Sequence, residues 1–363
     1  MNLSALCIYA GPLARRHIAS HGLQAADVAC IPAAAGGPKG LILGRLDQFL
    51  FGEWLPKSQQ PIDLLGASIG AWRMATACLN DAPAAFARLE HDYIAQHYAL
   101  KPGQKRPPAS EVSAQFRQNL NAFYGGRLQE VLQHPRFRLH LIAARGRHIM
   151  RKRGGLRAAV GYAGAYVSNA VARPALGAWL QRVVFSTANA QALPFDTRDI
   201  STRRVTLTER NFMDALQASC SIPFVLDPVT HITDAPSGCY WDGGITDYHL
   251  HMHYHPQPDQ GAGLVLYPHF QQAVVPGWLD KALKWRHTST RALDRMVVLA
   301  PHPQWVATLP NGKLPDRTDF TRFAHDFETR RRIWSVAVDA SQQLVDELAA
   351  WLEKPDVTAI RPL

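Results

Sequence analysis

The sequence predicts an α/β fold built on a mostly parallel central sheet. Over residues 27–79, buried strand candidates alternate with helix candidates, and such alternation indicates βαβ units whose strands run parallel. The composition, 47% apolar and 19% charged over 363 residues, can fill a large core and excludes a disordered chain. No shift in composition divides the sequence, so we expect a single domain over residues 1–363.

The N-terminal part of the chain supplies the alternation. A short helix closed by Gly22 is followed by an apolar strand candidate and a glycine-rich loop, and a second helix leads to another buried strand. That strand ends in a tight turn, after which a stretch rich in Ala, Met and Leu favours a helix. In order, the expected elements are helix 12–22, strand 27–35, loop 36–40, helix 41–55, strand 62–65 and a helix after residue 70.

The rest of the chain adds helices, strands and one unusual insertion. Residues 145–181 begin with a basic cluster and continue almost uncharged, which we interpret as an excursion between two core strands. Gly161, Gly164 and Pro174 argue against one long helix there. The other expected elements are helices at 82–98, 111–133 (interrupted at 125–126) and 322–353, and strands at 137–143, 182–187, 263–267 and 296–300.

The segment Gly66-Ala67-Ser68-Ile69-Gly70 has the form of a nucleophile elbow, a sharp turn between a buried strand and a helix. Glycines flank the serine where a β-carbon would collide with the strand or the helix. Such a turn holds the hydroxyl out of the sheet edge, with helix N-terminal amides behind it. Ser68 is therefore a candidate nucleophile, and an ordinary turn with a surface serine is the alternative.

A second glycine-rich segment, Gly36-Gly37-Pro38-Lys39-Gly40, lies between a strand and a helix before the elbow. Acyl transfer places negative charge on the former carbonyl oxygen, and unobstructed backbone amides can stabilise that charge. Pro38 has no amide proton, so Gly36, Gly37 and Lys39 are the available donors. The Lys39 side chain could also hold a phosphate or carboxylate as a point charge. The spacing matches neither a Walker A loop nor GxGxxG, and a plain turn is the alternative.

Asp242 precedes Gly243 and Gly244 in a tight turn and is the candidate base. A serine hydroxyl needs a group that accepts its proton, and a partly desolvated carboxylate within hydrogen-bond reach can do this without a histidine. A solvated aspartate in an ordinary turn is the alternative. Taken singly, this residue does not decide between the two.

In order and approximate spacing, the loop, the elbow and the Asp-Gly-Gly turn resemble the motifs of the patatin-like phospholipases. Residues 218–224, ASCSIPF, are similar to the family segment that precedes the Asp-Gly-Gly turn, so the likeness covers about residues 28–250. The resemblance implies a three-layer α/β/α sandwich and a lipid acyl ester as substrate. It further implies a Ser68–Asp242 dyad that needs neither a metal nor an organic cofactor.

The same resemblance assigns the oxyanion hole to the amides of Gly36, Gly37 and Ile69. Two departures from the family pattern lie in this loop, because Ala35 replaces a first glycine and Pro38 precedes the lysine. The excursion at 145–181 and the region beyond residue 255 have no obvious family counterpart, which favours a subfamily with its own substrate.

Two histidine-based alternatives stay open. An α/β-hydrolase would use a Ser-Asp-His triad, and His249, His251, His253 and His255 follow Asp242 closely. The early elbow and the lack of an HGGG-type loop favour the dyad. On a strand the four imidazoles would share one face, which can bind Zn²⁺ or Ni²⁺, but no carboxylate alternates with them. We expect neither a histidine base nor a metal site.

The formal net charge of +10 favours an anionic partner. The basic cluster and its apolar continuation fit docking to an anionic membrane, and the cluster lacks the interleaved aromatic residues of a nucleic-acid platform. A solvated loop is the alternative, and a lipid- or granule-surface binding protein with vestigial catalytic residues is the alternative function. The cluster consists of Arg145, Arg147, Arg151, Lys152, Arg153 and Arg157.

The cysteine pattern and the lack of a targeting or membrane-spanning segment indicate the cellular compartment. Five scattered cysteines, odd in number and without a CxxC pair, favour free thiols in a reducing compartment. The N-terminus does not have the pattern of a signal peptide, and no apolar run is long enough to span a bilayer. We expect a cytoplasmic protein, with or without peripheral membrane contact.

Overall fold

The computed structural model describes residues 3–98, 100, 104, 106–151, 155–257 and 259–363, and within 155–159 it describes the backbone only. A large central sheet runs through the described chain. Its strands are β1 (Leu6–Ala10), β2 (Val28–Ala33), β3 (Ile62–Ala67), β4 (Phe137–Gly146), β5 (Leu180–Ser186), β6 (Thr202–Thr206), β7 (Tyr240–Asp242), β8 (Leu264–Pro268), β9 (Met296–Pro301) and β10 (Arg361–Pro362).

The sheet is mixed, with a parallel centre. The strand order is β10-β1-β9-β8-β2-β3-β4-β5-β6, and β7 pairs with β4 outside this path. The strands β9-β8-β2-β3-β4 pair in parallel, whereas β4 pairs with β5 and β7, and β1 with β9, in the antiparallel sense. Every residue of β2 and β3 is buried, as expected for central parallel strands covered on both faces. The predicted α/β fold is confirmed.

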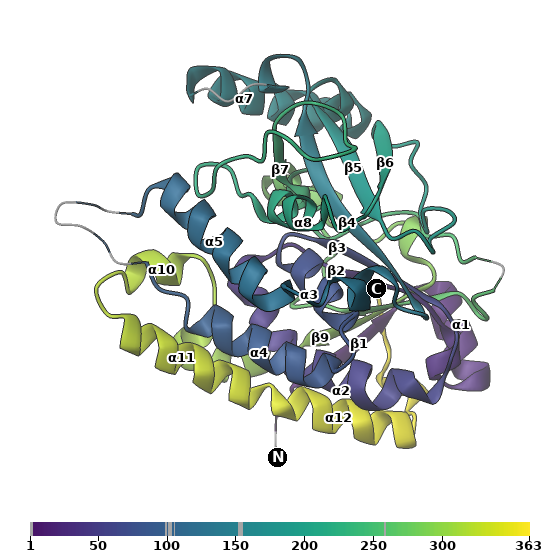
Figure 1. Ribbon diagram of the computed structural model, residues 1–363. Coiled ribbons are helices and arrows are strands. Elements are labelled where there is room, and N and C mark those ends of the chain that lie inside the picture. Colours follow the sequence, from purple (N-terminus) through teal and green to yellow (C-terminus); the bar gives the residue numbers. More distant parts are fainter. Residues whose placement is uncertain (1–2, 99, 101–103, 105, 152–154, 258) are drawn as a thin grey trace.

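Helices flank this sheet (Figure 1). They are α1 (Pro12–His21), α2 (Gly44–Phe49), α3 (Ile69–Ala77), α4 (Ala82–Ile94), α5 (Ala109–Tyr124), α6 (Leu128–Leu132), α7 (Gly155–Val171), α8 (Phe212–Cys220), α9 (Pro303–Thr308), α10 (Thr318–Arg322), α11 (Phe327–Ala340) and α12 (Gln342–Glu353). Of these, α3 packs against β3, and α8 packs against β4 and β7. These two helices therefore border the strands that carry the candidate dyad.

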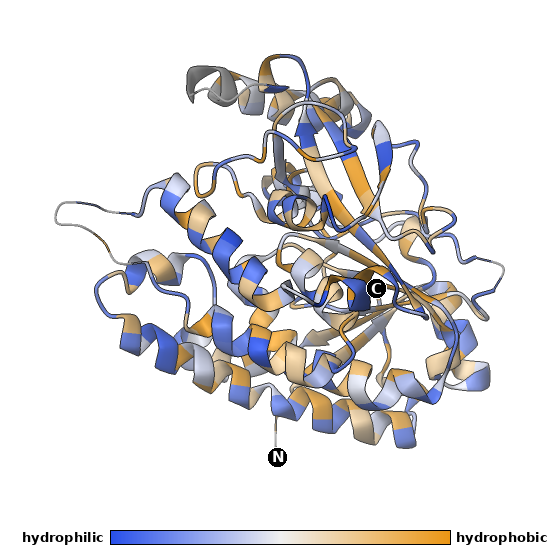
Figure 2. Cartoon of the chain, viewed as in Figure 1, coloured by the Kyte–Doolittle hydropathy of each residue, from blue (hydrophilic) through white to orange (hydrophobic). Residues whose placement is uncertain are grey.

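The predicted helix at 322–353 is divided in the structure. The chain leaves helical geometry after α10, and Asp326 starts α11 by accepting a hydrogen bond from the Thr329 amide at 3.1 Å. Ser341 then separates α11 from α12. Figure 2 shows blue and orange alternating along both helices, as expected for helices with one buried and one solvated side.

The excursion at 145–181 forms a short 3₁₀ turn (His148–Arg151), α7, and a second 3₁₀ segment (Arg173–Ala178) before β5. As expected, no single helix spans this stretch, because α7 ends at Val171 shortly before Pro174. Gly161 and Gly164, however, do not interrupt α7, which runs through both. A β-carbon on Gly164 would lie 2.4 Å from the Trp179 ring, and one on Gly161 would lie 2.5 Å from Met150. The glycines thus allow close packing, and in Figure 1 α7 lies at the opposite end of the molecule from α12.

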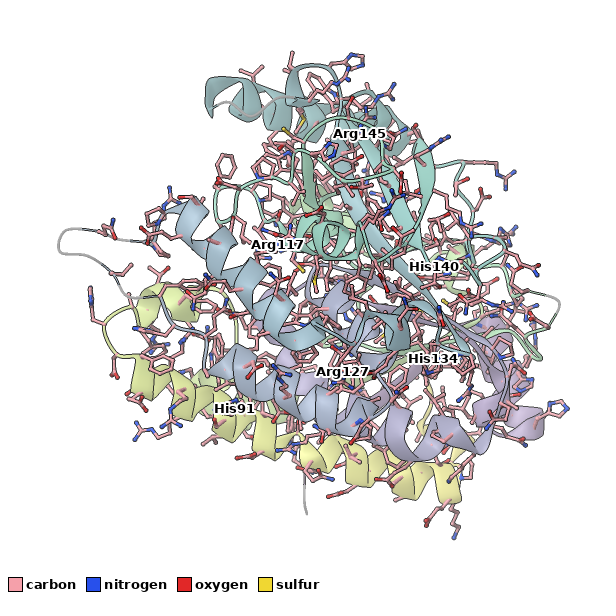
Figure 3. The ribbon with its side chains drawn as sticks, in the orientation of Figure 1. His91, Arg117, Arg127, His134, His140 and Arg145 are labelled. Carbon is pink, nitrogen blue, oxygen red and sulfur yellow. The ribbon has the colours of Figure 1, made fainter. Side chains whose placement is uncertain are left out.

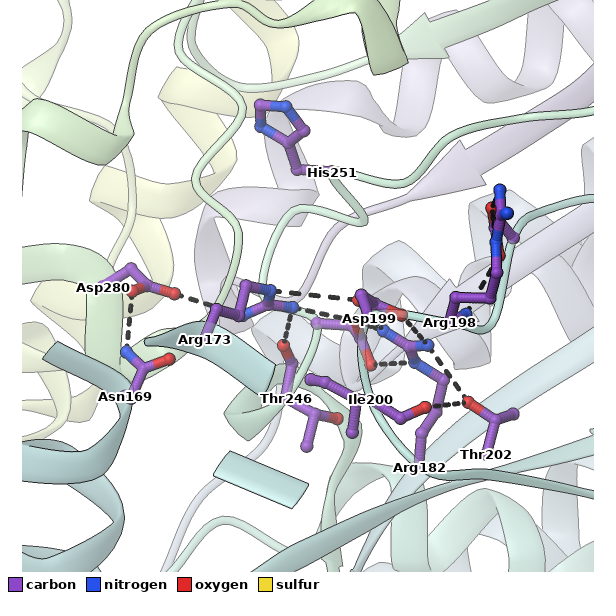
Figure 4. A network of polar contacts seen from close by, with 12 residues as sticks. Asn169, Arg173, Arg182, Arg198, Asp199, Ile200, Thr202, Thr246, His251 and Asp280 are labelled. Atoms are coloured by element: carbon purple, nitrogen blue, oxygen red, sulfur yellow. Dashed lines mark hydrogen bonds and ion pairs between the residues drawn. The ribbon is translucent and has the colours of Figure 1, made fainter. Parts of the chain in front are cut away.

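A buried ion-pair network ties this excursion to the sheet (Figure 4). Arg182 on β5 is fully buried and binds Asp247 with both Nε and Nη2, at 2.8 and 2.6 Å. Arg173 donates to the Thr246 carbonyl at 2.7 Å and pairs with Asp280 at 3.2 Å. Because residues 246 and 247 lie two and three positions after the Asp-Gly-Gly turn, the network helps to hold that turn in place.

All five cysteines are buried, and no disulfide joins any two of them. Across the described residues, no helix has the length and apolar character needed to cross a bilayer.

Candidate active site

Ser68 lies at the sharp turn between β3 and α3. Its backbone has φ 58° and ψ −131°, a conformation that a non-glycine residue rarely adopts and that strains the turn. A β-carbon on Gly66 would lie 2.5 Å from the Ala71 Cα, and one on Gly70 would lie 1.9 Å from the Ala33 carbonyl oxygen. The two flanking glycines are therefore required by close backbone contact, as expected for an elbow.

The turn brings Ser68 into direct contact with Asp242. The Ser68 hydroxyl donates to Oδ2 of Asp242 at 2.6 Å, although the two residues are 174 positions apart in sequence. The other carboxylate oxygen, Oδ1, accepts from the Gly244 amide at 2.7 Å. Ser68 is 2% exposed and Asp242 is 5% exposed. The carboxylate is thus held by two donors in a largely dry site.

Burial raises the pKa of Asp242 above its usual range, because desolvation disfavours the charged carboxylate. The positive charge of Arg317, the Ser68 hydroxyl and the Gly244 amide oppose this shift in that order. A carboxylate with a raised pKa is a stronger proton acceptor than a solvated one, which suits the role of a general base.

Backbone contacts fix the position of Asp242. The residue ends β7, where it pairs with Ala143 of β4, and its amide donates to the Ser221 carbonyl at 2.9 Å. A β-carbon on Gly243 would lie 2.1 Å from the Ile142 carbonyl oxygen, so only glycine allows the turn to approach β4 this closely.

The glycine-rich loop begins a 3₁₀ segment, Gly37–Leu43, directly beside the elbow. Gly37 has φ 58°, and a β-carbon on Gly36 would lie 2.5 Å from the Phe270 ring. Within the described chain, no hydrogen bond is found for the amides of Gly36, Gly37 or Ile69. These amides are therefore available to a ligand.

A cavity of about 320 Å³ opens beside Ser68. Gly37, Ser68 and Ile69 contribute to its wall, so the serine and the loop face the same space. Most of the remaining wall is apolar. Its aromatic members are Trp72, Tyr93, Tyr98, Phe116, Phe224, Phe320 and Phe323, and its charged members include Arg106, Arg317 and Arg330.

A model of the patatin-like phospholipase family matches residues 59–249, more than half of the chain, and this range contains both Ser68 and Asp242. The chain belongs to the patatin-like phospholipase family. Membership supports lipid acyl hydrolase activity in general terms. The loop at 36–40 lies outside the matched range.

Among solved structures, this patatin-like chain is similar to the crystal structure of VipD from Legionella pneumophila. The two are 13% identical, the likeness covers 96% of this chain and 71% of that chain, and the TM-score is 0.36. The family assignment does not depend on so weak a likeness. None of the curated proteins matches the sequence significantly.

The four histidines after Asp242 do not lie together on one face of a strand. The segment has no regular strand, and His249 is buried against His269, with 3.1 Å between Nδ1 and Nε2. His251 contacts the Val274 carbonyl at 2.7 Å. In the described chain, neither His253 nor His255 joins a group of metal-ligating residues, and the dyad has no histidine partner.

A second serine–carboxylate arrangement lies inside the sheet. His140 on β4 (Figure 3) has Nδ1 2.9 Å from the Ser186 hydroxyl and Nε2 3.0 Å from Oδ1 of Asp63. The order Ser-His-Asp is that of a catalytic triad. All three residues are at most 1% exposed, and none lines the cavity beside Ser68.

Three residues near the dyad were not predicted from the sequence. Arg317 lines the cavity, Lys281 lies near Asp242, and the Phe270 ring covers Gly36. All lie beyond residue 255, where the sequence offers no motif.

The predicted basic cluster is described only in part. Arg145 (labelled in Figure 3) bonds the Ser237 carbonyl and Gln181, and Arg147 bonds the Gly177 carbonyl. Arg151 is exposed and bonds the Ser237 hydroxyl. Lys152, Arg153 and the Arg157 side chain lie outside the described residues.

Proposed function

We propose that the protein is a serine acyl hydrolase that cleaves carboxylic ester bonds of lipids, with Ser68 as nucleophile and Asp242 as general base. The observation that carries this proposal is the 2.6 Å hydrogen bond between the two side chains, at a strained elbow that faces an apolar cavity.

In this mechanism Asp242 accepts the proton of Ser68 as the hydroxyl oxygen attacks the ester carbonyl. The amides of Gly36, Gly37 and Ile69 donate to the oxyanion of the tetrahedral intermediate. The intermediate collapses to an acyl-enzyme, and the alcohol leaves with the proton. Asp242 then takes a proton from water, whose oxygen attacks the acyl-enzyme. The bond between the acyl group and Ser68 breaks, the fatty acid leaves, and the proton passes from Asp242 back to the Ser68 oxygen.

The cavity supplies the binding energy for the acyl chain. Each methylene group that leaves water contributes about 0.8 kcal/mol, so an apolar wall next to the nucleophile favours a lipid ester over a small polar one.

The direct test is labelling with a fluorophosphonate probe, which forms a covalent bond with an activated serine. We expect the wild-type protein to be labelled and Ser68→Ala to be unlabelled. Ser186→Ala is the matched control, because it removes a second buried serine that contacts an acid–base side chain, and it should label like the wild type. Labelling that persists in Ser68→Ala would sink the mechanism.

We also propose that α7 docks the protein on an anionic membrane. On the described part of this helix, Val160, Val167 and Val171 are 54%, 61% and 82% exposed, and they repeat at helical spacing. The Tyr162 ring contacts that of Phe224, with 5.9 Å between the centroids, and the half-exposed Phe224 lines the cavity. Tyr162 lies on the packed side of α7, opposite the three valines, and through it this side of the helix reaches the cavity rim.

Sedimentation with vesicles tests this docking. We expect Val167→Asp to reduce binding to vesicles that contain phosphatidylglycerol, and added salt to weaken binding by the wild type. Val336→Asp on α11 is the control, because Val336 is 49% exposed on a helix remote from α7 (Figure 1). Equal loss in both variants would contradict a role for α7.

The alternative function, a lipid-surface binding protein without turnover, predicts vesicle binding together with an unlabelled Ser68. The two measurements on one preparation distinguish these functions.

A further inference from the structure

The end of α8 contacts both members of the candidate dyad. This helix packs against β4 and β7, and its last residues, together with Ser221 after it, are buried. The Ser221 carbonyl accepts from the Asp242 amide at 2.9 Å. Ser219 and Cys220 contact the backbone of Ser68. One short segment therefore holds the backbone of the nucleophile and of the base at the same time.

The amide of Ser68 lies just beyond the regular pairing of β3 with β4. That pairing ends at Ala67, which lies opposite Ile142. At Ser68 the backbone turns to φ 58°, so the amide points out of the strand ladder. A buried amide without an acceptor is costly, and Ser68 is 2% exposed. The turn therefore needs an acceptor from another element.

The hydroxyl of Ser219 supplies this acceptor. Its Oγ accepts from the Ser68 amide at 3.1 Å and donates to the Ile142 carbonyl at 2.6 Å. A hydroxyl can do both at once, because it carries one proton and two lone pairs. The Ile142 carbonyl is also the group that leaves no room for a β-carbon on Gly243. A single hydroxyl thus joins the elbow to β4 at the point where the Asp-Gly-Gly turn packs.

The carbonyl of Ser68 is held as well. The Cys220 thiol donates to it at 3.2 Å, and the Ala71 amide at the start of α3 donates to it at 2.9 Å. A backbone conformation that a non-glycine residue rarely adopts persists only where its surroundings fix it. Ser219 makes the stronger of the two contacts from α8, because a thiol is a weak donor.

We propose that Ser219 is a positioning residue, whose hydroxyl holds the Ser68 backbone in the strained conformation that aims its side chain at Asp242. Ser219 is fully buried, and among the described residues it is not part of the cavity wall, so it acts through Ser68 and not on the substrate. The inference rests on the proposed function, since it concerns the alignment of that dyad. It gives a role to residues 218–224, which the proposed chemical steps do not use.

The test compares Ser219→Ala with Ser341→Ala. Both substitutions remove the hydroxyl of a fully buried serine that donates to a backbone carbonyl at 2.6 Å, but Ser341 lies between α11 and α12. With a p-nitrophenyl ester we expect kcat of Ser219→Ala to fall at least ten-fold while KM stays near that of the wild type. The reason is that a displaced nucleophile slows the chemical step and leaves the cavity unchanged. Ser341→Ala should keep both constants.

Hydrogen exchange followed by mass spectrometry provides a readout that needs no turnover. In a peptide that covers residues 66–72, the Ser68 amide should exchange at least ten-fold faster in Ser219→Ala than in the wild type, and at an unchanged rate in Ser341→Ala. Ser219→Cys is a second variant that applies the same test if the alanine variant does not fold. Its thiol is a weak acceptor, so kcat and exchange should lie between those of the wild type and of Ser219→Ala.

Equal kcat in Ser219→Ala and Ser341→Ala, or unchanged exchange of the Ser68 amide, would overturn the role of Ser219. A wild-type protein without turnover would refute the proposed hydrolysis alone, because hydrogen exchange still decides whether this hydroxyl holds the elbow.

Discussion

Two buried serines of the described chain, Ser68 and Ser186, are hydrogen-bonded to a carboxylate or an imidazole, but their surroundings differ. Ser186 is linked to His140 and Asp63 in the order of a catalytic triad, but all three side chains are buried inside the sheet. Ser68 has no histidine, and it lies at a strained turn beside a cavity. This difference is why we propose Ser68 as the nucleophile: it combines a neighbouring cavity, a strained backbone and free amides, which Ser186 lacks despite its imidazole partner.

The hydrogen bonds among Asp63, His140 and Ser186 have a structural role. Asp63 also accepts from the Gln260 side chain at 2.6 Å, so the charge on β3 is bound from two sides. His140 joins β3 to β5 across β4, because its two nitrogens contact residues on both neighbours. Such a network stabilises only while every member keeps its partner.

The largest expected effect is on turnover in Asp242→Asn. An asparagine cannot accept the Ser68 proton, and general base catalysis contributes roughly 10²–10⁴-fold, so kcat should fall by about 10³-fold. Steady-state hydrolysis of a p-nitrophenyl ester measures this. Retained activity would favour a histidine base instead.

The same substitution should not weaken the fold. Because the pKa of Asp242 is raised in the folded protein, the folded state binds its proton more tightly than the unfolded chain does. The free energy of unfolding of the wild type therefore decreases as pH rises through the raised pKa, and Asp242→Asn lacks this decrease. Urea unfolding at pH 4 and pH 7 checks the sign: the variant should gain stability relative to the wild type at the higher pH.

Activity of the wild type should decline as pH falls through the same pKa, since protonation removes the base.

The smallest expected effect on activity is that of His140→Ala. Breaking the buried row leaves Asp63 with one polar partner fewer, which should lower the free energy of unfolding by about 3 kcal/mol. Urea denaturation measures the loss, and His91→Ala is the control because that side chain is 81% exposed. The kcat of the folded variant should stay near that of the wild type. A folded but inactive His140→Ala protein would indicate that Ser186, rather than Ser68, is the nucleophile.

The candidate dyad could be predicted because its signals are local. Gly66 and Gly70 flank Ser68 where the backbone leaves no room for a β-carbon, and Gly243 serves the same purpose beside Asp242. Such requirements are written into short motifs. The order of these motifs then matched a family, and the family match confirmed the membership.

Other features could not be predicted, since they arise from distant contacts. Gly164 has the sequence signature of a helix breaker, but in α7 it makes room for Trp179. Arg317 and Lys281 carry no local pattern, and only the folded chain places Arg317 against Gly37 and Lys281 over the Tyr248 ring. The four histidines alternate like a strand face, yet His249 turns inward to His269.

By itself, the sequence determined the α/β class and the family, and it marked Ser68 and Asp242 as candidates, because glycine positions and strand–helix alternation depend on neighbouring residues. Only the tertiary structure decided that Ser68 meets Asp242, that Ser186, His140 and Asp63 are buried together in the sheet, and that Arg317 lies against Gly37. Each of these depends on packing between segments far apart in the chain, where burial and approach distance are set by the whole fold.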